Sequence, residues 1–231
     1  MKTIKNILCD MLSAIYPKKC ICCREIIDDN SFICSICESK IERNSLDNIC
    51  LLCGFEKESC VCKYNVYRFD SLVCVFKNCG LAQKAYYAYK FLKQKHYADF
   101  FASEMCKAVE RCYKDVEFDF ITYVPSINRL GFNHSGYIAK EMSKKLNLHF
   151  EENLLYSAKH VKKQHKSTIK ERIENVEGKY KCNYNISGAR VLLVDDIKTT
   201  GATVDECAKV LLFAGAESVH CITALGSSEN N

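Results

Sequence analysis

The stretch that decides the fold is Val191-Leu-Leu-Val-Asp-Asp-Ile-Lys-Thr-Thr-Gly-Ala-Thr203. Its first four residues are apolar, which is typical of a central parallel strand that is buried on both faces. Two carboxylates, Asp195 and Asp196, follow at the carboxyl end of that strand. The amphipathic pattern of residues 202–214 then predicts a helix. A strand, an acidic pair, a small hydroxyl-rich loop and a helix thus follow one another without interruption.

This order predicts a site for a phosphorylated sugar. Open α/β sheets bind ligands outside the carboxyl ends of their strands, and a loop that opens a helix points free backbone N–H groups at an anion. Gly201 permits a backbone path that a side chain would obstruct, and the hydroxyls of Thr199, Thr200 and Thr203 can donate to phosphate oxygens. The carboxylates would repel a phosphate, so vicinal ribose hydroxyls or a bound Mg²⁺ are their natural partners. The alternative, an Asp that merely caps the helix, does not explain why all four parts occur together.

The rest of the chain from Tyr67 onward alternates strand-like and helix-like segments. We expect strands over residues 71–76, 118–124 and 219–225, and helical segments over residues 81–112 and 131–146. Strands that alternate with helices predict βαβ units, and hence an α/β fold with a parallel sheet covered by helices on both faces.

Residues 1–16 start with two lysines and an apolar run, which superficially suggests a signal peptide. Asp10 interrupts the run, and no small-residue cleavage site precedes Pro17. The apolar residues fall at helical spacing instead, so we expect an amphipathic helix that docks on the rest of the chain. They are Ile4, Ile7, Leu8, Met11, Leu12 and Ile15. Because no apolar run reaches about eighteen residues, no membrane span is predicted.

Ten of the seventeen cysteines precede residue 67, which indicates a metal-binding segment in a reducing cytoplasm. Eight of them form four close pairs: Cys20 with Cys23, Cys34 with Cys37, Cys50 with Cys53, and Cys60 with Cys62. Each pair can occupy two corners of a tetrahedron, so two pairs complete a closed, structural zinc site. The spacing leaves open whether successive pairs combine or cross over, and the last pair, with one intervening residue, departs from the usual pattern.

Composition and charge divide the chain near residue 66. Residues 1–66 hold nine Lys/Arg and nine Asp/Glu, so the net charge of +5 belongs to residues 67–231. A basic excess there suits phosphate-bearing ligands. We therefore expect an N-terminal helix with a Cys-rich double zinc ribbon over residues 1–66, and a ligand-binding α/β domain over residues 67–231.

The quoted segment resembles the phosphoribosyl pyrophosphate (PRPP) signature of type I phosphoribosyltransferases. The resemblance implies that the acidic pair contacts the ribose hydroxyls and that the following loop binds the 5-phosphate. The residues concerned are Asp195, Asp196, Lys198, Thr199, Thr200, Gly201, Ala202 and Thr203. Residues 123–126 are where the family places a pyrophosphate-binding loop. The resemblance therefore implies that Arg129, just after this loop, contacts the diphosphate and that Asn133 orients the loop. Taken alone, these residues would be interpreted as a turn and a helix start.

Three further polar features keep more than one interpretation. Residues 159–166 hold four lysines and two histidines, which suit a loop closing over pyrophosphate, a nucleic-acid backbone contact or a solvated loop. Lys90 faces the same site or extends to solvent from an amphipathic helix. His134 is interpreted as a packing residue and not as a base, because no partner is identifiable.

The order of the motifs along the chain resembles the ComF family, and within it the ComFC type. The cysteine pairs come first, followed by Arg129-Leu-Gly-Phe-Asn133, the basic loop with Gln164, then Arg172 and Asn175, and last the PRPP segment. The resemblance implies a cytoplasmic protein of natural transformation that handles incoming single-stranded DNA. It also implies PRPP with Mg²⁺, structural zinc and a competence helicase as partners, and it leaves open whether any phosphoribosyl transfer occurs. The alternatives are a metabolic nucleobase phosphoribosyltransferase and a non-catalytic zinc-scaffold adaptor.

Overall fold

The computed structural model describes residues 17–27, 31–60, 62, 66–91, 95–126, 133–158 and 178–227. The strands are β1 (Ser71–Lys77), β2 (Phe120–Tyr123), β3 (His149–Phe150), β4 (Leu155–Ser157), β5 (Tyr180–Cys182), β6 (Arg190–Lys198) and β7 (Ser218–Gly226). The helices are α2 (Ser35–Glu38), α3 (Gly80–Phe91), α4 (Ala98–Cys112), α5 (His134–Leu146) and α7 (Ala202–Phe213), with 3-10 turns at Leu46–Asn48, Lys57–Ser59 and Lys95–Tyr97. The predicted helix of residues 1–16 lies outside the described residues.

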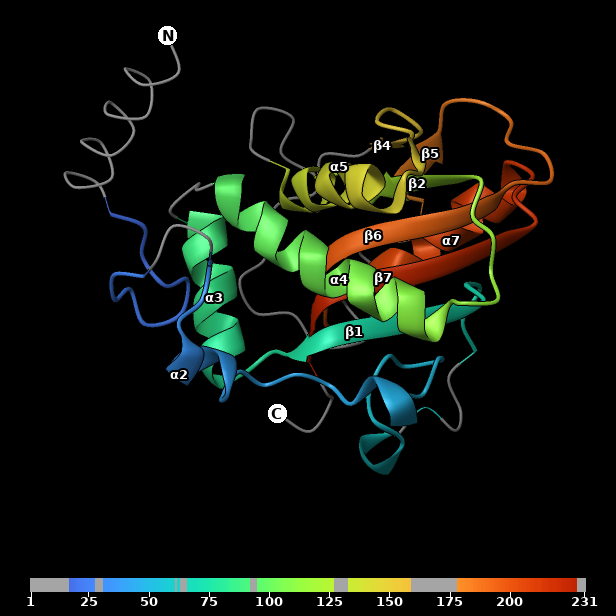
Figure 1. The fold of residues 1–231 in the computed structure, drawn as a ribbon. Coiled ribbons are helices and arrows are strands. Elements are labelled where there is room, and N and C mark those ends of the chain that lie inside the picture. Colours follow the sequence, from blue (N-terminus) through green and yellow to red (C-terminus); the bar gives the residue numbers. More distant parts are fainter. Residues whose placement is uncertain are drawn as a thin grey trace, which may run out of the picture.

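Five parallel strands form the main sheet in the order β1-β7-β6-β2-β3 (Figure 1). The predicted α/β fold with a parallel sheet is thereby confirmed. Strand β6 lies in the middle, and its Val191–Val194 run is completely buried, as expected for a strand covered on both faces. The strand continues beyond this run through the acidic pair to Lys198, because its ladder with β7 extends to Lys198 opposite Gly226.

Helices cover both faces of the sheet (Figure 1). Leu192 and Val194 pack on the side of α4 and α5, whereas Val191 and Leu193 pack on the side of α7 and the β4–β5 hairpin. Successive residues of a strand point to opposite faces, so one apolar run supplies both cores. Within the described residues, no helix has the length and the apolar content to cross a bilayer.

The helical segment predicted over residues 81–112 is two helices, α3 and α4, that point in different directions (Figure 1). A 3-10 turn at Lys95–Tyr97 precedes α4 and buries Tyr97. The hydroxyl of Tyr97 donates to the carbonyl of Lys19 at 3.0 Å and accepts from Arg24 at 3.0 Å. The break therefore connects the first cysteine-containing segment to the helical layer, a tertiary contact that helical periodicity does not reveal.

The Cys-rich segment pairs along the outer edge of β1. The Asn44 N–H donates to the carbonyl of Val75 at 2.9 Å, and the Cys74 N–H donates to the carbonyl of Gly54 at 3.0 Å. These bonds satisfy backbone groups that an edge strand would otherwise leave unpaired. The predicted division into two domains at residue 66 stays a prediction, but the two parts meet along this edge.

Candidate ligand site and metal centres

Asp195 lies at the carboxyl end of β6 with its side chain buried beneath α5. Its Oδ1 accepts hydrogen bonds from Ser135 Oγ at 3.0 Å and from the Asp196 N–H at 2.8 Å. Burial, and then the neighbouring charge of Asp196, raise the pKa of Asp195 well above its usual value. Asp195 therefore keeps its proton at pH values where an exposed aspartate is ionised.

Asp196 faces α3, which supplies a hydroxyl and a cation. The Tyr86 hydroxyl donates to Asp196 Oδ2 at 2.6 Å, and Lys90 Nζ lies 3.7 Å from the same oxygen. Lys90 also donates to the Tyr86 oxygen at 2.8 Å, which is possible because the two residues stand one helical turn apart. Of the two interpretations of Lys90, the structure favours the one in which it faces the acidic pair.

His134, the first residue of α5, packs beside this cluster. Its Nε2 lies 3.2 Å from the carbonyl of Lys90, and its ring meets the Tyr89 ring edge-on at 5.2 Å. Tyr89 in turn donates its hydroxyl to the carbonyl of His134 at 2.8 Å. Burial lowers the pKa of His134, so the ring is neutral at pH 7. This position agrees with a packing role.

The loop between β6 and α7 leads directly into the N-terminus of a helix. Gly201 precedes α7 with φ of 84°, a left-handed conformation that strongly favours glycine. Thr200 Oγ1 accepts a hydrogen bond from the Ala202 N–H at 3.3 Å, and Thr203 lies in the first turn of the helix. The positive end of the α7 dipole therefore lies at this loop, which follows the acidic pair in the chain.

Lys198 differs from the other residues of the predicted loop. Its side chain is buried, and its Nζ lies 4.6 Å from the centroid of the Phe55 ring. Its carbonyl accepts a hydrogen bond from the Ser227 N–H at 2.8 Å. The ammonium thus points toward the Cys-rich segment, so its predicted contact with a 5-phosphate would come from the backbone or from another rotamer.

Part of the predicted diphosphate site falls outside the described residues. Arg129, the basic stretch 159–166, Arg172 and Asn175 all belong to that part of the chain. Of the neighbouring residues, Val124 holds the start of the predicted pyrophosphate loop alongside β6, because its N–H donates to the carbonyl of Val194 at 2.9 Å. Asn133 caps α5 by accepting the Gly136 N–H at 2.8 Å. Its contribution is to fix the start of that helix.

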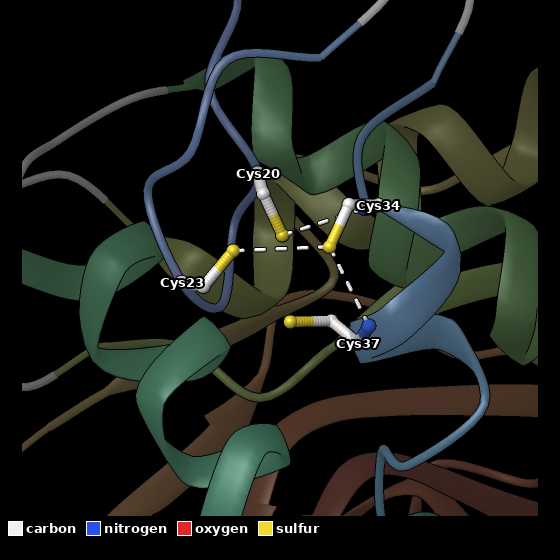
Figure 2. Close-up of side chains that lie close together, drawn as sticks. All are labelled: Cys20, Cys23, Cys34 and Cys37. Atoms are coloured by element: carbon white, nitrogen blue, oxygen red, sulfur yellow. Dashed lines mark hydrogen bonds between the residues drawn. The ribbon is translucent and has the colours of Figure 1, made fainter.

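The paired cysteines gather into two groups of four in sequential order. The first contains Cys20, Cys23, Cys34 and Cys37, and the second contains Cys50, Cys53, Cys60 and Cys62, with all sulfur atoms of a group within 4.8 Å of one another. Figure 2 shows the first group converging from two segments. A tetrahedron with Zn–S bonds of about 2.3 Å has sulfur–sulfur edges of ~3.8 Å. The edges of 3.8 Å between Cys23 and Cys34 and of 3.6 Å between Cys50 and Cys62 are close to that value. Cys60 lies closer to its neighbours, at 3.4 Å from Cys50 and 3.0 Å from Cys62, so its sulfur would move outward to join the tetrahedron. Both groups can therefore hold a zinc ion.

Short hairpins present the first pair of each group, Cys20 with Cys23 and Cys50 with Cys53. In the first, Lys19 pairs with Ile26 and the Cys20 N–H donates to the carbonyl of Glu25 at 2.7 Å. In the second, Ile49 pairs with Glu56 in the same way. The repeated pairing explains why both turns aim two thiols in one direction.

The second group also contains a thiol that ionises easily. Hydrogen bonds from the thiol and then from the backbone N–H of Cys62 lower the pKa of Cys60 to about 7. Burial raises the pKa of Cys53 and of Cys62 in the same group. Because zinc binds thiolates, its binding would release the protons of these two thiols.

Sequence reasoning missed Tyr86 and Ser135, which donate to the two carboxylates. The spacing of Tyr86 and Lys90 by four residues was a usable signal, since it places both on one helix face. Nothing local distinguishes Tyr86 from Tyr87 and Tyr89 in the same run. Ser135 likewise reads as an ordinary residue of a helix start.

Comparison with known proteins agrees with this geometry. The family model described as phosphoribosyl transferase domain matches residues 127–230, which contain the acidic pair, the loop and α7. The chain therefore carries a phosphoribosyltransferase-type domain with the type I parallel-sheet fold.

Two curated relatives indicate which kind of phosphoribosyltransferase-type protein this chain resembles. The DNA utilization protein YhgH of Escherichia coli (strain K12) is 30% identical over 91 residues, and the alignment covers 39% of this chain and 40% of that protein. Competence protein F of Haemophilus influenzae is 29% identical over 94 residues, which cover 39% and 41% of the two chains.

The predicted resemblance to the ComF family is thus confirmed: the chain is similar to a competence protein F and combines a phosphoribosyltransferase-type domain with two cysteine groups. The matched part spans about 40% of the length of these relatives.

Solved structures of phosphoribosyltransferases are similar in fold to this chain at low TM-scores. An adenine phosphoribosyltransferase is 15% identical with a TM-score of 0.42, and the match covers 60% of this chain and 75% of that one. The UMP synthase of Leishmania donovani is 19% identical with a TM-score of 0.36, covering 60% and 24%. Nothing about the ligands of this chain follows from them.

Proposed function

We propose that this chain is a cytoplasmic protein of natural competence that binds PRPP with Mg²⁺ and handles single-stranded DNA during DNA uptake. The observation that carries the proposal is the acidic pair at the carboxyl end of β6, directly followed by the loop that opens α7. The names of the curated relatives support the role in DNA uptake, and the basic excess of residues 67–231 suits a nucleic-acid partner. A competence helicase is the protein partner that fits this role.

The two carboxyl groups have different parts in the proposed site. Asp196 stays beside Lys90 and offers carboxylate oxygens to the ribose hydroxyls of PRPP, which are donors. Asp195, with its raised pKa, can both accept and donate a hydrogen bond. The 5-phosphate takes the loop of Thr199 to Thr203 at the start of α7, where the positive end of the helix dipole and the threonine hydroxyls favour an anion. Arg129 and the residues that follow β2 are the proposed diphosphate contacts.

Magnesium fits this arrangement as the counterion of the PRPP diphosphate. Oxygen donors are the ligands that Mg²⁺ prefers, and it usually keeps several waters while it contacts one or two carboxylates and substrate phosphates. Asp196 is the described carboxylate best placed to support it, although the cation of Lys90 at 3.7 Å competes for the same oxygen. Zinc has the separate role of folding the Cys-rich segment, because each four-cysteine group is a closed set of ligands.

Calorimetry with PRPP and MgCl₂ tests the proposal. Removal of a hydrogen bond to a charged group costs about 1.5–3 kcal/mol, so Asp196→Asn should weaken PRPP binding by roughly 10- to 100-fold. Asp119→Asn is the matched control, because this exposed carboxylate accepts the Arg190 N–H at the opposite end of β6, at 2.8 Å. Equal PRPP affinity of Asp196→Asn and the wild-type protein would contradict the proposed site.

DNA binding needs its own measurement. Contacts to the phosphate backbone release counterions, so the affinity for a single-stranded oligonucleotide should fall steeply as the salt concentration rises. Binding that does not change with salt would argue against a backbone-directed mode, and absence of binding at low salt would remove DNA from the proposal.

A further inference from the structure

Residues 67–70 lead from the Cys-rich segment into β1, and we call them the connector. The end of the connector is anchored on β7, because the Asp70 N–H donates to the carbonyl of Val219 at 2.9 Å and Asp70 Oδ2 accepts the Val219 N–H at 2.8 Å. Phe69 is buried in the core on the α7 side of the sheet. The second half of the connector therefore has a fixed position, from which its first half reaches the start of α7.

The ring of Tyr67 packs against the turn that opens α7. A Cβ on Gly201 would lie 3.4 Å from this ring and 3.6 Å from the Lys198 side chain, so these two groups fill the space beside the glycine. The Tyr67 ring is supported in turn by Phe69, on which it stacks at a centroid distance of 4.7 Å with 16° between the ring planes. Glycine has a wider choice of backbone conformations than any other residue. Tyr67 therefore restricts the proposed PRPP loop at the residue that could move most easily.

Arg68 holds the first turn of α7. Its guanidinium pairs with Asp205 Oδ2 at 3.0 Å, and its backbone N–H donates to Asp205 Oδ1. The Asp205 N–H donates to the carbonyl of Gly201 at 2.9 Å, which closes the first turn of the helix. The connector thus contacts both residues that form this hydrogen bond, one through Tyr67 and the other through Arg68.

The ion pair of Arg68 also changes the charge at the start of α7. Asp205 lies in the first turn of the helix, and an uncompensated carboxylate there would repel a phosphate bound at the preceding loop. The Asp205 side chain is only 15% exposed, so solvent screens its charge only in part. Arg68 neutralises this carboxylate and so leaves the positive end of the helix dipole available to an anion.

We propose that Tyr67 and Arg68 are positioning residues of the PRPP loop: Tyr67 holds the Gly201 turn in place, and Arg68 neutralises Asp205. Tyr67 follows Cys62, the last cysteine of the second group, by five positions, so the connector joins that group to the loop. That the loop binds PRPP rests on the proposed function, whereas the contacts of the connector do not.

Calorimetry with PRPP and MgCl₂ on the full chain with its zinc tests the role of Tyr67. Tyr67→Ala should weaken PRPP binding by roughly 5- to 30-fold, because one freed loop residue must then be ordered on binding. Tyr67→Phe keeps the packed ring and should bind PRPP as the wild type does. This rescue by the ring alone is what a positioning role requires.

The same titration tests Arg68. Arg68→Gln should weaken PRPP binding by roughly 2- to 5-fold, which is the usual effect of one charge near a helix terminus, and Arg68→Lys should restore most of the affinity. Arg111→Gln is the matched control, because it removes another Arg–Asp ion pair, that with Asp47, from α4. Equal PRPP affinity of Arg68→Gln and Arg111→Gln would overturn the role of Arg68.

A fluorescent reporter separates positioning from a general loss of stability. The chain has no tryptophan, so Tyr67→Trp introduces a single indole beside Gly201. Addition of PRPP should change its emission. Phe213→Trp, at the other end of α7 and 84% exposed, should show no such change. An emission from Tyr67→Trp that stays constant while calorimetry detects PRPP binding would overturn the role of Tyr67.

Amide hydrogen exchange of residues 199–203 in the free chain measures the order of the loop without a ligand, and it should be faster in Tyr67→Ala than in Tyr67→Phe. If Tyr67→Ala binds PRPP as tightly as the wild type, the inference is wrong and the PRPP site stands. If the wild type binds no PRPP but the loop exchanges faster in Tyr67→Ala, the proposed function is wrong and the connector still holds the loop. If Tyr67→Ala does not fold, the Tyr67→Trp and Arg68→Gln variants decide the outcome.

Discussion

Replacement of Tyr86 by Phe tests the link between α3 and the acidic pair. The substitution removes one oxygen and leaves the buried ring in place, so no cavity for a side chain is created. That oxygen donates to Asp196 Oδ2 at 2.6 Å and accepts from Lys90 at 2.8 Å. Asp196 loses a donor in a site where its side chain is only 13% exposed.

The expected magnitude follows from these contacts. A hydrogen bond to a charged group contributes about 1.5–3 kcal/mol. The Lys90 side chain is 36% exposed and its 3.7 Å ion pair with Asp196 is partly screened by solvent, so the lost Lys90 contact adds little. For a chain of this length a change of 1 kcal/mol shifts Tm by about 2–4 °C, so Tyr86→Phe should lower Tm by about 3–12 °C.

Thermal and urea denaturation at pH 7 measure this effect, with equal zinc content in all samples. Tyr87→Phe is the matched control, because Tyr87 is the neighbouring residue on α3 and is 47% exposed. Its effect should stay within about 0.5 kcal/mol. The reasoning is refuted if Tyr86→Phe unfolds at the same temperature as the wild type, since the hydroxyl would then contribute nothing to holding Asp196.

The remaining predictions concern Asp195 and the metal. Burial raises the folded-state pKa of Asp195, so the folded chain holds this proton more tightly than the unfolded chain does, and the stability contributed is lost as pH rises through the folded-state pKa. Asp195→Asn should therefore unfold at a higher urea concentration than the wild type, with a larger difference at pH 8 than at pH 5; a difference independent of pH would show that Asp195 does not titrate as inferred. Elemental analysis should find two zinc ions per chain. Removal of zinc by a chelator should lower Tm and expose thiols to a colorimetric reagent. The reason is that each structural zinc in small zinc modules contributes about 10–16 kcal/mol of apparent binding free energy to folding. Protein without zinc and with unchanged stability would contradict the metal assignment.

The features that the sequence predicted well are those that depend on residues next to one another in the chain. Val191–Val194 is an apolar run typical of a strand buried on both faces, and Gly201 marks the turn before α7. The cysteine pairs are equally local, since the two cysteines of each pair are at most three positions apart. Their sequential combination was not predictable, because it depends on which hairpins meet in space.

The features that sequence could not supply depend on long-range contacts. Helical periodicity runs through the segment that contains the turn at Lys95–Tyr97, so only the hydrogen bond from Tyr97 to Lys19 reveals why α4 starts where it does. Lys198 resembles a phosphate-binding lysine in sequence, but Phe55, 143 positions earlier, lies beneath its ammonium. Ser135 meets Asp195 only because α5 packs over β6.

The position of the Cys-rich segment suggests why metal and ligand sites occur in one chain. Strand β1 is at the edge of the main sheet, and its outer backbone groups pair with Asn44 and Gly54. Segments this small need a metal to hold their shape, so zinc in the cysteine groups would stabilise the part of the chain that covers this edge. Phe55 continues from that edge to Lys198, the residue where the PRPP loop begins. Loss of zinc from the second cysteine group should therefore displace Phe55 and, through it, Lys198 at the start of the proposed PRPP loop. The affinity for PRPP should then fall together with the zinc content of that group.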